Sequence, residues 1–154
     1  KIAERYKDNE WIGGYDLLNE TNWDLPGGVD LKDLFVRITD AIREVDDKHI
    51  IIIEGNDYAN NFTGLTPPWD DNMVYSFHKY WSYLDNLDWI IPSREQYNVP
   101  LWMGESGENS NTWFTDAVIL FEENNIGWAW WTMRKMESIK VHIISQLTRG
   151  IGIY

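Results

Sequence analysis

The sequence predicts an α/β protein in which strands and helices alternate around a parallel sheet, and two observations predict this. Short apolar, β-rich runs alternate along the chain with segments of helical periodicity. The runs are apolar almost throughout, which is typical of strands that are covered on both faces, as in a parallel sheet. With 154 residues, of which 44% are hydrophobic, the chain suffices for one domain with its own core.

Five apolar runs are expected to form the strands. They are residues 11–18, 50–53, 73–77, 100–104 and 126–131. Residues 56–71, between the second and third runs, are rich in Asn, Gly and Pro and are expected to form a long loop with at most a short helix. No internal repeat or low-complexity segment is evident.

The clearest helix is expected between the first two runs, with Asp30 as its N-cap. Its apolar side chains recur at the spacing of one helix face, and they are Leu31, Leu34, Phe35, Ile38, Ala41, Ile42 and Val45. A second helix is expected from about Thr112 to Glu123. A weaker one is expected within residues 83–97, interrupted or ended by Pro92.

The charge and composition exclude several classes of partner. A net charge of −12 with a pI near 4.5 argues against nucleic acid and against an anionic membrane surface. No apolar run is long enough for a transmembrane helix, and Lys1 does not begin a signal-peptide pattern. The chain has no cysteine, which excludes disulfides and thiolate metal ligands, and its three histidines lack metal-ligand spacing. We therefore expect neither a metal nor a cofactor.

The aromatic content is high, with ten Trp and eight Tyr. Because Trp is difficult to bury completely, several are expected on a surface or in a groove, where the flat C–H faces of sugar rings would pack on them. Three are expected in the core or between helices, namely Trp11, Trp89 and Trp113. For three others in loops after strands, sugar contact and loop packing both stay open; these are Trp23, Trp69 and Trp81.

Polar and aromatic residues mark the ends of the expected strands. Asn19 and Glu20 follow the first strand, His78 and Tyr80 the third and Glu105 the fourth, while Trp131 ends the fifth. The carboxyl ends of parallel strands form the edge where α/β barrels and open sheets place their active sites. Two carboxylates on separate strand ends are what cleavage of a glycosidic bond requires. Three further acids near this edge are assigned supporting roles at best: Glu54, Asp57 and Glu108.

Four ordered motifs carry a resemblance to a known family. They are Gly-Tyr-Asp-Leu-Leu-Asn-Glu at 14–20, Ser-Phe-His-Lys-Tyr at 76–80, Met-Gly-Glu-Ser-Gly at 103–107 and Gly-Trp-Ala-Trp-Trp at 127–131. In this order on successive strands they resemble glycoside hydrolase family 5, a family of retaining (β/α)8-barrel glycosidases. The resemblance covers residues 1–138 and corresponds to the fourth to eighth strands of the barrel. It implies a partial TIM barrel of about five βα units.

The resemblance implies roles for six residues. Glu20 corresponds to the general acid/base and Glu105 to the nucleophile, a pair about 5–5.5 Å apart in retaining enzymes. Asn19 corresponds to the residue that binds the sugar 2-hydroxyl. The substrate-binding set continues with His78, which would contact the sugar or the acid/base, with Tyr80, which would hydrogen-bond Glu105, and with Trp131, which would lie beneath the sugar at the cleavage point.

The implied function is that of a secreted endo-β-1,4-glucanase, a cellulase that cleaves β-glucan with retention and without a cofactor. The alternative is a catalytically weak or inactive barrel fragment that binds β-glucan or only self-associates. The alternative arises because the family's first three strands carry an Arg and a His, and no residue of this sequence can be assigned their roles. The same motifs also serve mannanases and xyloglucanases.

The chain departs from the resemblance at its end. Residues 1–138 are assigned to the partial barrel and residues 139–154 to a divergent tail, whose β-branched content favours a strand or an oligomerisation segment. An open slice of a barrel leaves two unpaired strand edges and an apolar face. We therefore expect a homo-oligomer, a dimer or larger, in which copies of the chain complete the barrel.

Overall fold

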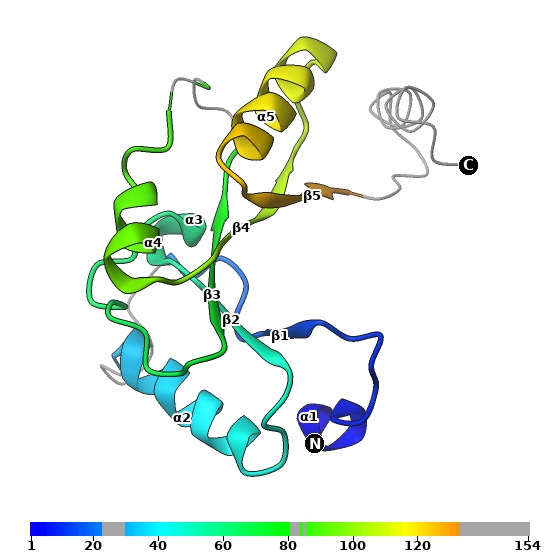
Figure 1. Cartoon of the computed structure of the whole chain (residues 1–154), viewed down its shortest axis with the longest axis vertical. Helices are drawn as coiled ribbons and strands as arrows, with labels where there is room; N and C mark the ends of the chain where they lie inside the picture. The colour runs from blue at the N-terminus through cyan, green and yellow to red at the C-terminus, as the bar shows by residue number, and fades with distance from the viewer. Residues whose placement is uncertain (23–29, 81–83, 85, 133–154) are drawn as a thin grey trace. The chain divides into compact units, whose positions relative to one another are not determined.

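The computed structural model describes residues 1–22, 30–80, 84 and 86–132. Contacts divide the chain into two compact units: unit 1 comprises residues 1–77 and 88–102, and unit 2 comprises residues 78–87 and 103–154 where they are described. Ten elements follow one another (Figure 1): α1 (Ile2–Tyr6), β1 (Gly14–Asp16), α2 (Leu31–Arg43), β2 (Ile50–Glu54), α3 (Asn56–Ala59), β3 (Met73–His78), α4 (Ile91–Tyr97), β4 (Leu101–Gly107), α5 (Asn111–Glu123) and β5 (Gly127–Trp131).

The strands lie in the order of the chain, β1-β2-β3-β4-β5. In unit 1, β1 pairs with β2 in parallel, with Gly14 opposite Ile50, and β2 pairs with β3 in parallel, with Ile51 opposite Met73. The five strands therefore confirm the predicted runs and the predicted βα repeat. The first is shorter than expected, because of residues 11–18 only 14–16 form the strand that pairs with β2.

Helix α2 confirms the clearest sequence prediction. Asp30 is its N-cap, and its Oδ1 accepts the backbone N–H of Asp33 at 3.1 Å. This bond satisfies one of the donors that the first turn of a helix leaves without an intrahelical acceptor. The buried face of the helix carries Phe35 and Thr39. The expected loop over residues 56–71 is also confirmed, with α3 as its short helix.

Helix α4 corrects the expectation about Pro92. The proline was expected to interrupt or end a helix, but it lies in the first turn, and the helix runs on from Ile91 to Tyr97. The physical reason is that the N–H groups of the first turn have no acceptor within the helix, so the missing N–H of proline costs no hydrogen bond there. The fixed φ of proline also suits that position. Asn98, in the left-handed conformation, ends the helix.

A buried carboxylate fixes the turn after α2. The Tyr15 hydroxyl donates to Asp46 Oδ2 at 2.6 Å, and His49 Nδ1 contacts the same oxygen at 2.7 Å. The backbone N–H groups of Lys48 and His49 donate to Oδ1 at 3.0 and 3.1 Å. Burial alone would raise the pKa of Asp46, but these donors, first among them Tyr15, hold that pKa below its ordinary value. Burial and the neighbouring Asp46 raise the pKa of Tyr15 to about 12.

Unit 2 is built on β4, α5 and β5. Its core holds Met103 from β4 and three side chains of α5, which are Phe114, Ala117 and Phe121. Ser110 caps α5 by accepting the N–H of Trp113 at 3.2 Å, so the helix begins one residue before the expected Thr112. The Phe114 ring meets Trp130 of β5 edge to face, with centroids 4.7 Å apart. This contact attaches the helix to the last described strand.

The environments of several tryptophans differ from the expectation. Trp11 was expected in the core or between helices, but it is 89% exposed, and Trp89 is 43% exposed although its ring meets Phe77 edge to face. Trp69 packs in its loop, where its Nε1 donates to the Thr39 hydroxyl at 3.1 Å. Trp23, Trp81 and the tail 139–154 lie outside the described residues.

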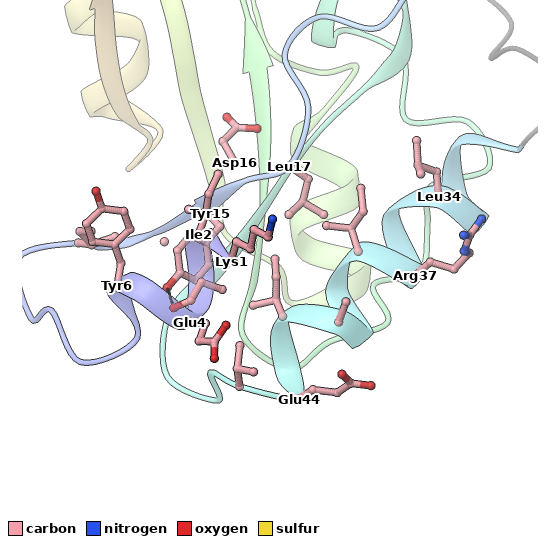
Figure 2. A pocket seen from close by; sticks show the side chains of 17 residues that line it. Lys1, Ile2, Glu4, Tyr6, Tyr15, Asp16, Leu17, Leu34, Arg37 and Glu44 are labelled. Atoms are coloured by element: carbon pink, nitrogen blue, oxygen red, sulfur yellow. Dashed lines mark hydrogen bonds between the residues drawn. The ribbon is translucent and has the colours of Figure 1, made fainter.

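Unit 1 also has an apolar groove of about 990 Å³ between α1, β1 and α2 (Figure 2). The residues that line it include the apolar Ile12, Leu34 and Ile42 and the charged Glu4 and Arg37. None of the six predicted site residues lines it. Among the described residues, no helix is long and apolar enough to cross a lipid bilayer.

Candidate active site

The loop after β1 carries the first two predicted site residues, both in unit 1. Asn19 is exposed and Glu20 is half-buried. Glu20 has a φ of 48°, which is the left-handed region that a residue with a side chain rarely adopts. Its backbone N–H donates to the Glu54 carboxylate, with 2.6 Å between N and Oε2. The loop is therefore attached to the end of β2 at the residue predicted to be the acid/base.

Glu54, at the end of β2, is the acceptor of this bond. It was assigned a supporting role at best, yet its side chain is among the most buried of the chain at 2% exposure. A carboxylate is rarely buried to this extent unless other groups hydrogen-bond it. The available signal was an acid that ends a run of four isoleucines, because such a position places a charge at the carboxyl end of a buried strand.

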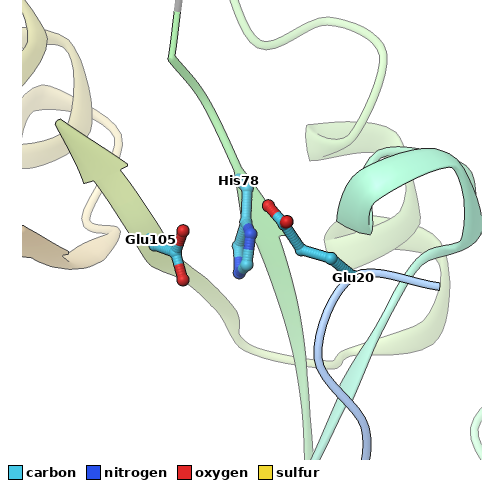
Figure 3. Close-up of side chains that lie close together, drawn as sticks. All are labelled: Glu20, His78 and Glu105. Atoms are coloured by element: carbon cyan, nitrogen blue, oxygen red, sulfur yellow. The ribbon is translucent and has the colours of Figure 1, made fainter. Parts of the chain in front are cut away.

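Three predicted residues come together in unit 2, at the ends of β3 and β4. The Tyr80 hydroxyl donates to Glu105 Oε1, which is the contact that the resemblance implies. His78 is 4% exposed, and the Glu105 carboxylate points toward its ring (Figure 3). Figure 3 also draws Glu20, in the loop after β1. The phenol fixes one oxygen of Glu105, since a hydrogen bond to a carboxylate is among the stronger ones in proteins.

Backbone contacts of unit 2 hold this group in register. The Lys79 N–H donates to the Glu105 carbonyl at 3.2 Å, and the Ser106 hydroxyl donates to the Lys79 carbonyl. The Asn109 amide donates to the Tyr80 carbonyl at 2.9 Å. Tyr80 is thus anchored through its backbone as well as through its hydroxyl. Sequence reasoning missed Asn109, because nothing in the pattern distinguishes it from an ordinary loop asparagine.

Trp131 ends β5 with 53% of its surface exposed, as an aromatic platform would require. Its backbone depends on Gly107 at the end of β4, because a Cβ at Gly107 would overlap the Trp131 carbonyl oxygen. The two other tryptophans of β5 are less exposed; the rings of Trp128 and Trp130 lie 5.1 Å apart, and Trp130 packs on α5. This agrees with the expectation that at least one of the three tryptophans is core packing.

The two groups of residues suit acid–base and nucleophilic chemistry. Unit 2 offers a carboxylate that a phenol orients, beside a buried imidazole, and unit 1 offers a half-buried carboxyl on a fixed loop.

Comparisons with known proteins agree with the sequence motifs. The model of the cellulase family, glycosyl hydrolase family 5, matches residues 1–137. The endoglucanase Cel5A of Thermotoga maritima is similar in structure over 87% of this chain and 56% of its own, with a TM-score of 0.75 and 21% identity. The cellulose synthase subunit Z of Clostridioides difficile is similar over 94% of this chain and 64% of its own, with a TM-score of 0.77 and 22% identity.

A curated β-xylosidase of Phanerodontia chrysosporium is 34% identical over 82 residues, which are 52% of this chain and 17% of that protein. The chain thus spans less than two thirds of the length of each of these relatives. The structural likenesses confirm the predicted fold class, an α/β chain that forms part of a TIM barrel.

Proposed function

We propose that this chain, which belongs to glycosyl hydrolase family 5, the cellulases, carries the catalytic pair of a retaining endo-β-1,4-glucanase. The observation that supports this most is the hydrogen bond from the Tyr80 hydroxyl to the Glu105 carboxylate. A nucleophilic carboxylate must face the anomeric carbon, and a phenol donor on one of its oxygens fixes that orientation. An ordinary surface glutamate at a strand end would have no need of such a partner.

In the proposed reaction the bond to the anomeric carbon is exchanged twice. Glu105 attacks that carbon while Glu20 gives its proton to the glycosidic oxygen, so the C–O bond breaks and a covalent glycosyl-enzyme forms. Glu20, now a carboxylate, then takes a proton from a water molecule as the water's oxygen displaces Glu105. Two inversions at one carbon retain its configuration.

The other predicted residues would bind and orient the sugar. Asn19 would hydrogen-bond the 2-hydroxyl, a contact that strengthens in the transition state. His78 would contact the sugar or the acid/base. The exposed indole of Trp131 would stack beneath the sugar at the cleavage point, since aromatic rings pack well on flat C–H faces.

The substrate is the finer part of the proposal. Solved structures of Thermotoga maritima Cel5A are complexes with cellobiose and with mannotriose, and the curated relative is a β-xylosidase. We propose β-1,4-glucan as the substrate, and we propose that the protein acts outside the cell, where such polysaccharides occur.

The test is an activity screen on glucan, mannan and xylan, with Glu105→Gln, Glu20→Gln and the surface variant Glu123→Gln run beside the unmodified chain. We expect hydrolysis of glucan that both site variants abolish and that Glu123→Gln leaves unchanged. Proton NMR of the first product should show the β-anomer, as retention requires. Activity that survives both site substitutions would refute the roles, and cello-oligosaccharide binding without any product would favour a binding fragment.

We also propose that the chain self-associates. Among the described strands β1 and β5 are the edges of the sheet, and the apolar groove lies beside β1 (Figure 2). Exposed side chains at and near this groove include Ile2 at 71% and Val45 at 39%. Unpaired strand edges and exposed apolar surface favour association with another chain. Light scattering after size exclusion should give the mass of a dimer or larger, and a stable monomer would refute this.

A further inference from the structure

Glu54 is the most deeply buried carboxylate among the described site residues, and it contacts the backbone of the proposed acid/base. Its side chain is 2% exposed, and its Oε2 accepts the Glu20 N–H at 2.6 Å. A charged acceptor makes a shorter and stronger bond to a backbone N–H than a neutral one does. The bond joins residues that are 34 positions apart in the chain, so it ties the loop after β1 to the end of β2.

The backbone of Glu20 requires such support. With φ at 48°, Glu20 occupies a conformation that is costly for a residue with a Cβ and that persists only where the surroundings enforce it. The side chain of Glu20 leaves the backbone in a different direction in this region than in the extended one. The carboxyl of the proposed acid/base is therefore aimed by a backbone conformation that Glu54 stabilises.

A second contact holds the other side of the same loop. The residue after Glu20 is Thr21, and its carbonyl accepts the Tyr58 N–H at 3.1 Å. Tyr58 lies in α3, in a left-handed turn where Asp57, Tyr58 and Ala59 have φ of 53°, 56° and 66°. Successive non-glycine residues in this region are unusual, and such strain gathers at functional sites.

The turn is itself closed by reciprocal backbone bonds. The Asn56 N–H donates to the Asn61 carbonyl and the Asn61 N–H donates to the Asn56 carbonyl, both at 2.8 Å. The Asn61 side-chain amide donates to Asp57 Oδ2 at 3.0 Å. The end of β2 and the turn after it thus hold the Glu20 loop from two sides.

We propose that Glu54 is a positioning residue for Glu20, with the left-handed turn Asp57–Ala59 as a second support. This rests on the proposed function, in which Glu20 protonates the leaving group. Glu54 does not touch the substrate in this proposal. Its carboxylate fixes the backbone of Glu20 so that the Glu20 carboxyl meets the glycosidic oxygen when the C–O bond breaks.

The test compares Glu54→Gln and Glu54→Leu with Glu123→Gln, an exposed change on α5. Aryl β-cellobiosides with a poor leaving group (phenol) need an acid to leave, whereas those with a good one (dinitrophenol) do not. Misplacing the acid should therefore lower kcat/KM for the phenyl substrate, which reports the first displacement, by about 10- to 100-fold, a part of the roughly 100- to 10,000-fold that general acid catalysis contributes, and should spare kcat/KM for the dinitrophenyl substrate. Glu54→Gln, which keeps an acceptor, should fall between the native chain and Glu54→Leu.

An equal loss of kcat/KM on both substrates would overturn the proposal, because general damage to the fold does not distinguish leaving groups. A second readout needs no activity: amide hydrogen exchange at Glu20, followed by NMR, should accelerate by about tenfold or more in Glu54→Leu. Unchanged exchange would also overturn the proposal. If the native chain hydrolyses neither substrate, the proposed function fails, and the exchange rate still decides whether Glu54 fixes Glu20. Should Glu54→Leu not fold, Glu54→Gln provides the same comparisons.

Discussion

The Tyr80→Phe substitution tests the orientation of the proposed nucleophile with the smallest possible change. It removes one oxygen atom, the donor to Glu105 Oε1, and leaves the ring in place. A hydrogen bond to a charged group contributes about 1.5–3 kcal/mol. Because both side chains are half-buried and water can replace part of the bond, we take about 2 kcal/mol, which corresponds to about a 30-fold loss of rate.

The loss should appear in kcat rather than in KM, because the phenol orients the attacking oxygen and does not hold the sugar. The assay is steady-state hydrolysis of an aryl cellobioside, with thermal unfolding measured on the same samples. Stability should change by less than about 1 kcal/mol, since solvent reaches the site. The matched control is Tyr6→Phe, the same chemical change in α1, which should leave both readouts unchanged. A Tyr80→Phe variant with native kcat, or one with a raised KM alone, would refute the reasoning.

Three further outcomes are expected. Gly107→Ala should lower stability by about 1–3 kcal/mol and also reduce activity, because its Cβ would overlap the Trp131 carbonyl. The control is Gly13→Ala, where nothing lies within 4 Å of the added carbon. In melting and rate assays this control should change neither stability nor activity. Trp131→Ala should raise KM by about tenfold at nearly unchanged melting temperature, since the indole is exposed. Asp46→Asn should cost about 3 kcal/mol in denaturant unfolding, and because the pKa of Asp46 is lowered, its contribution should be present above about pH 4 and be lost as the pH falls further. Because the pKa of Tyr15 is raised to about 12, the contribution of Tyr15 to the free energy of unfolding should be lost only as the pH rises from about 10 through 12.

The sequence predicted the strands well because their apolar runs are nearly continuous. Residues 50–53 and 73–77 extend by only one residue each in the structure, to Glu54 and His78. Predicting the role of Pro92 failed for a physical reason: proline both ends helices and begins them, and the choice depends on where the neighbouring chain turns. The prediction that Trp11 lies in the core was wrong for a different reason. An apolar ring within a strand is expected to be buried, but β1 begins only at Gly14, and Trp11 before it is exposed.

The sequence proposes candidate site residues as far as its motifs reach. Asn-Glu, His-x-Tyr and Glu at strand ends pointed to Glu20, His78, Tyr80 and Glu105, and the bond from Tyr80 to Glu105 is present. The importance of Glu54 could not be predicted in this way. It rests on the burial of Glu54 and on its contact with Glu20, which lies 34 residues away in the chain. Spacing along a chain reports what shares a strand or a helix face, and contacts between separate loops leave no such periodic signal.

The most direct test of the proposed catalytic pair is to trap its covalent intermediate. A 2-fluoro cellobioside with a dinitrophenyl leaving group should react with the chain, because fluorine slows the second displacement more than the activated first step. Peptide mass mapping should then locate one sugar on the fragment that contains Glu105, and Glu105→Gln should take up none. A label on another residue, or turnover of the parent substrate with no label, would contradict the assignment of Glu105 as nucleophile.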